Sequence, residues 1–263
     1  MKTLQTHHLR MKQNRRRKRI IFSSIFGFLL VILLLGYLFL FSPVFKIKNI
    51  EISQTRITDS NVIRQDIQKI LDQGVILGPL VITNNILFVP VIQINDYLRG
   101  LPAIAIFSQD RGFFSGILKI NIQEREVTGV LKQASGGGYY FDKGGVIFSN
   151  TADDTEGEMF FTIENNLNRQ FDLGDRILEG GSFQELMNIV QLMNDNFFSN
   201  RVKLQKDKLE ISVTLHDDKE TSFYLNVDNL SQTLSVITYF IQNNFNFDLE
   251  YLDLRYLPNV YYK

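Results

Sequence analysis

Three spacings of apolar residues divide this chain into segments with different predicted structures. Residues 20–41, IIFSSIFGFLLVILLLGYLFLF, form an apolar run without a single charge. At 1.5 Å per residue such a run makes a helix of roughly 33 Å, enough to cross the hydrocarbon core of a bilayer. Beyond it, segments in which apolar and polar residues alternate predict strands, and segments in which apolar residues recur every three or four positions predict helices.

The pattern over residues 43–126 predicts the order strand, helix, helix, strand, strand. Alternation in FKIKNIEIS (45–53) predicts the first strand, and helical spacing predicts helices over 58–71 and 90–99. Two more strands are expected on either side of a turn at 110–112. The residues expected to face the core are Ile63, Ile67, Ile70, Leu118, Ile120 and Ile122. Two helices on one face of a three-stranded sheet would bury all these apolar side chains.

Residues 127–263 predict a second set of strands with two helices. The predicted strands before the C-terminus are 129–133, 138–150, 208–217 and 221–227. The second of them is expected to fold back at Asp142–Gly145, where glycines permit the positive φ of a tight hairpin. One helix is predicted over 182–197, begun by a capping box of Ser182 and Glu185, and another from about Asp228. The apolar positions of these helices are Phe183, Leu186, Met187, Val190, Met193, Leu230, Leu234, Ile237 and Ile241.

This order of elements predicts an α+β protein in four parts. Residues 1–19 form a basic tail, 20–41 a single transmembrane helix, 43–126 a domain with a three-stranded sheet and two helices, and 127–263 a mixed, strand-rich domain.

The zero net charge of the chain hides a basic end and an acidic body. Eight of the 28 Lys and Arg residues lie in residues 1–19, which contain no acid, so residues 42–263 carry 20 basic and 28 acidic side chains. Basic flanks of membrane helices stay in the cytoplasm, so we expect a single-pass type II protein of the cell membrane with its bulk outside.

The amino-terminal segment has two other interpretations. A cleaved signal peptide has an apolar run of only about 7–15 residues and a small-residue cleavage site, which SPVF does not provide. A Lys/Arg cluster also binds nucleic acid, but this one lies directly against the apolar run. The pattern favours a topology signal and no nucleic-acid partner.

The residue inventory argues against catalysis. The chain has no cysteine, and its three histidines are His7, His8 and His216. With two of them in the basic tail, neither a His-containing metal site nor a Ser-His-Asp triad can be assembled in the outer part. The acids Asp153, Asp154, Glu156 and Glu158 could bind Ca²⁺ or Mg²⁺ through oxygen, but neighbouring Gly and Thr favour an acidic loop. We expect no enzyme, no cofactor and no metal.

The chain ends on an alternating, tyrosine-bearing segment, LEYLDLRYLPNVYYK (249–263). An edge strand exposes unpaired N–H and C=O groups, which are a hazard unless they are covered or receive a strand from a partner. Val260, Tyr261 and Tyr262 are expected to supply such an edge, because tyrosine adds rigid contact area at interfaces. Alternatively, the tyrosines only complete the sheet.

Three stretches make this chain resemble the FtsQ/DivIB family of bacterial cell-division proteins. INIQEREVTGVLKQ is similar to the family's strand that ends in Glu-Arg, here Glu124-Arg125, between its POTRA and β domains. YYFDKGGVIFSN is similar to the family's hairpin with Asp before Gly, and YLDLRY (251–256) to the Asp-Leu-Arg run of the penultimate strand. The sequence departs from the family at Val127, where the family places Pro.

The resemblance implies a POTRA-like domain over 43–126 and a β domain over 127–263. It also implies a non-enzymatic scaffold at the division septum that docks FtsB-like and FtsL-like coiled-coil proteins and so helps to control the septal peptidoglycan synthase indirectly. By the same resemblance, the partner-binding surface lies on the last strands, with Tyr251, Asp253, Arg255 and Tyr256 added to the terminal residues. The alternative is that Leu252 and Leu254 face the core and Asp253 and Arg255 form a local salt bridge.

Two other classes of function remain open. A POTRA-containing module of a secretion or outer-membrane assembly system would bind a β-barrel or secretin. A membrane-anchored cell-wall enzyme or sensor would carry a cleft with clustered acids. The YLDLRY run favours the division scaffold over the first, and the shortage of histidine and cysteine argues against the second.

Overall fold

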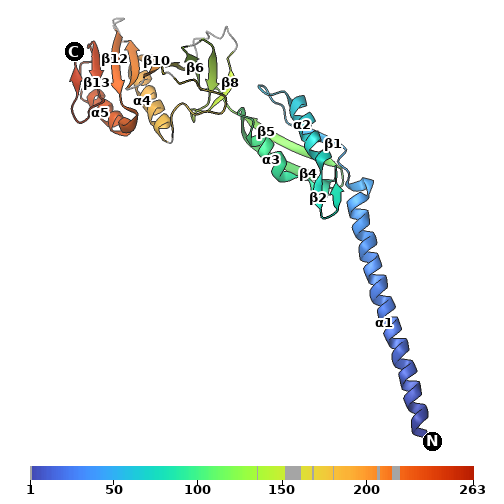
Figure 1. Ribbon diagram of the computed structural model, residues 1–263. Helices are drawn as coiled ribbons and strands as arrows, with labels where there is room; N and C mark the ends of the chain where they lie inside the picture. The colour runs from blue at the N-terminus through green and yellow to red at the C-terminus, as the bar shows by residue number, and fades with distance from the viewer. Residues whose placement is uncertain are drawn as a thin grey trace. The chain divides into compact units, whose positions relative to one another are not determined.

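The computed structural model describes residues 2–134, 136–151, 161–167, 169–179, 181–205, 208–214 and 220–263 (Figure 1). Helix α1 (Lys2–Phe41) opens the chain. Its segment Ile21–Phe41, 21 residues with a mean hydropathy of 2.7, is long and apolar enough to cross a membrane.

The chain divides into two compact units, which are described one at a time. The first unit comprises Met1–Gln54, Asp59–Asp96 and Ser108–Asn121. The second unit comprises Thr55–Thr58, Tyr97–Phe107 and Ile122–Lys263.

A three-stranded sheet with the order β1-β5-β4 follows α1. Its strands are β1 (Asn49–Ile52), β4 (Ile104–Gly112) and β5 (Ile117–Glu124), and β1 runs parallel to β5. Helices α2 (Ser60–Gln73) and α3 (Val91–Arg99) lie on one face of this sheet (Figure 1). The predicted α+β class and the three-stranded sheet are confirmed.

The two helices of this region were predicted from the sequence because the residues that specify each helix lie within a few positions of one another. The Asp59 side chain accepts a hydrogen bond from the Asn61 amide at 2.8 Å and caps α2, as expected for a short acid at this position. Ile63 and Ile67 are buried, and the helix ends at Gly74, which has a φ of 72°. Leu71 rather than Ile70 completes the buried stripe, a shift of one residue.

Two local predictions in this region were wrong or incomplete. The turn expected at 110–112 lies at 113–116, because β4 continues to Gly112 and Gly116, with a φ of 71°, closes the turn. The Gly116 amide donates to the Gly112 carbonyl at 2.8 Å. A short hairpin, β2 (Val75–Leu77) and β3 (Leu80–Ile82), fills a segment for which no strands were predicted.

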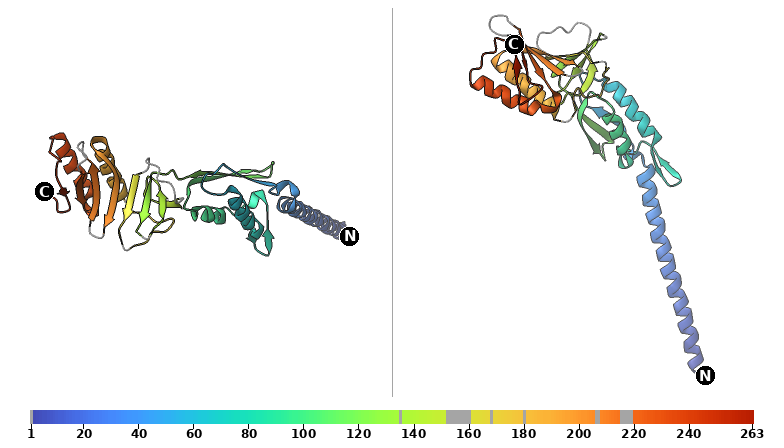
Figure 2. Two further views of the ribbon diagram at one scale, coloured as in Figure 1. Left: turned by 90° about the horizontal axis from the view of Figure 1, so that it is seen from above. Right: turned by 60° about the vertical axis from the view of Figure 1, so that its left-hand side comes forward.

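The second unit contains a nine-stranded sheet with the order β14-β13-β12-β11-β10-β9-β6-β7-β8. Its strands are β6 (Gly129–Gln133), β7 (Gly138–Phe141), β8 (Ile147–Asn150), β9 (Phe161–Asn165), β10 (Phe198–Gln205), β11 (Lys208–Thr214), β12 (Glu220–Leu225), β13 (Tyr251–Asp253) and β14 (Tyr261–Tyr262). Helices α4 (Ser182–Asn196) and α5 (Leu230–Gln242) lie side by side on one face of it (Figure 2). The core fills the space between these helices and the sheet.

The hairpin predicted at Asp142–Gly145 is present between β7 and β8. Gly145 has a φ of 72°, and a Cβ at this position would lie 2.6 Å from the Phe183 ring. Glycine is therefore required here both by the backbone conformation and by the close approach of α4.

The predicted start of α4 at Ser182 is confirmed, but the predicted capping box is wrong. The cap residue is Gly181, without a side-chain hydrogen bond, so Ser182 and Glu185 do not form the capping box. The buried stripe contains Ile189 in addition to most of the predicted positions, while Met187 is only half-buried. The acidic loop at 153–158 and His216 lie outside the described residues.

The α5 contact with the sheet yields a stability test. Ile237 is fully buried, whereas Tyr239 on the same helix has 61% of its surface exposed. We expect Ile237→Ala to lower the free energy of unfolding by about 2–5 kcal/mol, because it removes apolar contacts and leaves a cavity. Tyr239→Ala is the matched control and should change it little. Urea unfolding of the full chain in detergent, followed by circular dichroism, measures both, and equal midpoints for the two variants would contradict the packing described.

Candidate functional site

The last two strands place the carboxyl end of the chain at an edge of the nine-stranded sheet. β13 runs parallel to β12 and antiparallel to β14, with Leu252 opposite Tyr262 and Asp253 opposite Tyr261. β14 has β13 on one side and no further strand on the other among the described residues. The end of the chain therefore forms an edge strand.

The free side of β14 presents backbone groups in a defined order. The Lys263 amide donates to the Tyr251 carbonyl at 3.3 Å, so the backbone N–H and C=O groups of Lys263 point toward β13. Because successive residues of an antiparallel strand point their N–H and C=O groups to opposite sides, those of Tyr262 point away from β13. An added strand would pair with Tyr262.

The register also assigns the two terminal tyrosines to opposite faces. Leu252 is fully buried on the helix-covered face, and Tyr262 opposite it lies with its ring centroid 6.1 Å from that of Phe245. Tyr261 pairs with Asp253 and therefore lies on the open face. Both tyrosine side chains remain more than half exposed.

Aromatic and basic side chains form a continuous patch on the open face, here called the tyrosine patch: Tyr224, Tyr251, Arg255, Tyr256 and Tyr261. The Tyr224 and Tyr251 rings stack at 5.7 Å. The Arg255 guanidinium carbon lies 5.8 Å from the centre of the Tyr224 ring and 5.2 Å from that of Tyr256. The Tyr256 and Tyr261 rings meet edge to face at 6.2 Å. Tyrosine and arginine are the side chains enriched at protein interfaces.

Asp253 holds the arginine of this patch in place. Its two carboxylate oxygens accept from Arg255 Nε at 3.0 Å and Nη2 at 2.7 Å, a bidentate pair. Burial opposes ionisation of Asp253, but the hydrogen bonds and charge of Arg255 outweigh it and lower the pKa of Asp253 below its ordinary value. The pair restricts the arginine side chain before any partner arrives.

Of the residues expected at a partner-binding surface, the structure brings together Tyr251, Asp253, Arg255, Tyr256 and Tyr261, and their binding role stays a prediction. Leu252 and Leu254 are fully buried, and Asp253 and Arg255 form the local pair that was weighed as an alternative. Val260 lies just before β14 and is half-buried.

One member of the tyrosine patch and a lysine beside it were missed. Tyr224 lies on the open face, and the Lys208 ammonium lies 3.6 Å from the centre of its ring. Strict alternation in TSFYLNV, with Phe223 and Leu225 inside, would have placed Tyr224 on the opposite face.

The Glu124-Arg125 pair and Asp142, singled out by the family resemblance, form a satisfied polar cluster in the second unit. Glu124 accepts from the amides of Arg56, Ile57 and Thr58 at 2.6–3.2 Å. These bonds outweigh the effect of burial and lower the pKa of Glu124.

Arg125 completes this cluster. It pairs with Asp142 and donates from Nε to the Pro102 carbonyl at 2.8 Å. Asp142 in turn accepts from the amides of Gly144 and Val146, each at 2.9 Å. Every carboxylate here is engaged within the chain, so the cluster stabilises the fold.

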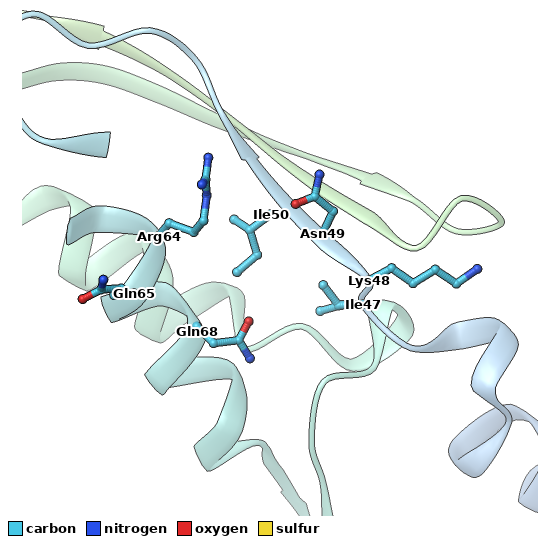
Figure 3. A pocket seen from close by; sticks show the side chains of 7 residues that line it. All are labelled: Ile47, Lys48, Asn49, Ile50, Arg64, Gln65 and Gln68. Carbon is cyan, nitrogen blue, oxygen red and sulfur yellow. The ribbon is translucent and has the colours of Figure 1, made fainter. Parts of the chain in front are cut away.

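A pocket of about 260 Å³ lies between β1 and α2 in the first unit (Figure 3). Its lining residues are Ile47, Lys48, Asn49, Ile50, Arg64, Gln65 and Gln68. None of these seven is an acid or a histidine. Gln68 is already held by Asp72 at 2.9 Å and Asn84 at 3.0 Å.

Metal-binding chemistry finds no support in the residues that the structure describes, which contain no group of three His, Asp or Glu side chains able to hold an ion. No family model matches the chain, and no curated protein matches it. The edge strand and the tyrosine patch are therefore the features from which a function can be argued.

The Asp253–Arg255 pair predicts a pH-dependent stability. Because the pKa of Asp253 is lowered in the folded chain, the stabilisation is fully present at neutral pH and is lost as the pH falls below about 3.9, the unfolded value, through the folded one. Asp253→Asn should cost about 1–3 kcal/mol at pH 7 by leaving Arg255 without its partner.

Unfolding measurements repeated at low pH test the direction in which the stabilisation by the Asp253–Arg255 pair changes with pH. The difference between wild type and Asp253→Asn should shrink as the pH falls through this window. Glu250→Gln is the control, since the Glu250–Lys263 pair is mostly exposed on both sides and surface pairs contribute little. A difference that is constant from pH 7 to pH 3 would contradict the assigned role of the pair.

Proposed function

We propose that this protein is a membrane-anchored, non-enzymatic scaffold of the bacterial division machinery, of the FtsQ/DivIB type, whose β14 edge docks a strand of a partner protein. The observation that carries the proposal is the free backbone edge at Tyr262 beside the tyrosine patch. A partner strand would gain backbone hydrogen bonds from the edge and side-chain contacts from both faces.

The rest of the chain supports this assignment. A helix long enough to span a membrane precedes β1, α2, α3, β4 and β5. Apart from the β2–β3 hairpin between α2 and α3, this is the element order that the resemblance associates with a POTRA domain. The nine-stranded sheet with two helices then takes the place of the family's β domain. The basic residues in the first part of α1, before its apolar segment, support a cytoplasmic amino terminus and an extracytoplasmic bulk.

The proposed partners are FtsB-like and FtsL-like coiled-coil proteins, through which the scaffold acts on septal peptidoglycan synthesis. An extended partner segment beside β14 places alternate side chains on opposite faces. Those on one side meet Tyr261, and those on the other meet Tyr262 and Phe245. Arg255 is already oriented by Asp253, so less conformational entropy is lost on binding.

A proline substitution at the edge tests the proposal. Tyr262→Pro removes the outward N–H while sparing the bonds to β13, because proline is tolerated on the free side of an edge strand. Tyr262→Thr removes the same ring but keeps the N–H and a β-favouring side chain. We expect the proline variant to lose at least about fivefold more partner affinity than the threonine variant, since an unmade buried hydrogen bond costs about 1–3 kcal/mol.

The measurement is co-purification of small coiled-coil membrane proteins with the full-length chain from detergent-solubilised membranes. Equal recovery by both variants and wild type would show that the β14 edge is not the docking site. Recovery of a β-barrel or secretin instead would favour the secretion-module alternative over the division scaffold.

A further inference from the structure

The carboxyl end of α1 is fastened to the rest of the first unit. The Asn85 side chain donates from Nδ2 to the carbonyls of Phe39 at 3.1 Å and Leu40 at 3.0 Å, satisfying groups that a helix end leaves without partners. Asn85 is only 3% exposed, and the Phe39 and Phe45 rings meet at 5.3 Å. The residues around Asn85 therefore keep a fixed place relative to the end of α1.

This attachment locates the first unit relative to a bilayer that α1 would cross. The apolar segment Ile21–Phe41 is about 31 Å long at 1.5 Å per residue, which matches the hydrocarbon core. Phe41 would then lie at the outer boundary of this core. The headgroup layer extends roughly 5–8 Å further, so residues just after Phe41 would lie within it.

Two hairpins are joined to the segment that follows α1. The Ile47 amide donates to the Asn84 carbonyl at 2.8 Å, just after β3, and the Lys48 amide donates to the Gly116 carbonyl at 2.7 Å, in the β4–β5 turn. Figures 1 and 2 show the β2–β3 hairpin beside the end of α1, and Figure 3 shows the β4–β5 turn next to Lys48. Both hairpins lie at the membrane end of the first unit.

The large side chains exposed on the β2–β3 hairpin and in the 113–116 turn are apolar, and Ser115 is the polar residue of that turn. In the β2–β3 hairpin Ile76 is 75% exposed and Val81 55%, and residues 74–82, GVILGPLVI, contain no polar side chain. In the β4–β5 turn Phe114 is 87% exposed and Phe113 44%. Exposed apolar groups gathered in this way mark an interaction surface.

Basic residues flank this apolar surface. Lys46 and Lys48 are both exposed on the segment between α1 and β1. Apolar side chains at the boundary of the acyl chains, with lysine at the headgroups, are the composition of an interfacial membrane contact.

We propose that the β2–β3 hairpin and the β4–β5 turn insert into the headgroup layer of the membrane that α1 spans, with anionic phospholipid as the occupant. The inference rests on the proposed membrane span of α1. Three attachments, α1 and two hairpins, would fix the tilt of the first unit on the membrane, which a single helix leaves free.

Tryptophan quenching tests this directly, because the chain contains no natural Trp. Single variants of the full-length protein, Phe114→Trp and Ile76→Trp, are reconstituted in phosphatidylcholine–phosphatidylglycerol vesicles with and without bromine on the acyl chains. Val62→Trp is the matched control, since Val62 is 52% exposed but lies near the start of α2, about 16 Å along the helix from its end at Gln73. Phe39→Trp reports on α1 itself.

If the hairpins insert, plain lipid should shift the fluorescence emission of Phe114→Trp and Ile76→Trp to shorter wavelength. Brominated lipid should reduce the intensity of that emission. The emission of Val62→Trp should not change with either lipid. Quenching of Phe39→Trp alone would overturn the hairpin contact and leave the membrane span intact. No quenching of Phe39→Trp would overturn the span and the contact together. Equal quenching of Val62→Trp would show that the unit lies on the membrane without using the hairpins, which also overturns the proposal.

Discussion

A sheet covered by helices on one face only is the constraint from which the candidate surface follows. In β12 and β13 the residues Phe223, Leu225 and Leu252 are buried beneath the helices. Because side chains alternate along a strand, burying these three obliges Tyr224 and Tyr251 to lie on the open face. The alternation that places apolar side chains in the core therefore also places the tyrosines of β12 and β13 on the opposite, open face.

Backbone groups that regular secondary structure leaves without a partner are the second feature, and the end of α1 and the strand β14 are two described examples. At the end of α1 the helix carbonyls are satisfied from inside the protein by Asn85. At β14 the outward groups of Tyr262 have no strand beside them among the described residues. A helix end whose carbonyls accept hydrogen bonds from another segment is held against that segment. An edge strand with free N–H and C=O groups can instead pair with an incoming strand.

Specificity at such an edge depends on the side chains around it, since backbone pairing is the same for any sequence. Here the neighbours are large rings and a guanidinium that Asp253 already orients. The edge strand itself is only two residues long, and short edges limit unwanted pairing between copies. Selectivity for one partner would arise from this combination of a short edge and a structured aromatic surface.

The sequence alone determined the elements whose signals are local. The charge-free run of α1, the Asp59 cap, the glycine hairpin at Asp142–Gly145 and the alternation of β5 were all readable, because each depends on neighbours within a few residues. It also marked the terminal tyrosines and the Asp253–Arg255 run. The capping box predicted at Ser182 and Glu185 was wrong, because Gly181 is the cap residue of α4 and makes no side-chain hydrogen bond.

The tertiary structure decided which residues from distant segments of the chain lie in contact. The sequence could not place Tyr224 beside Tyr251, because their pairing depends on the parallel register of β12 and β13, separated by α5. Nor could it join Asn85 to the end of α1 across 45 residues. Such contacts depend on the packing of distant segments, for which a single sequence carries no local signal.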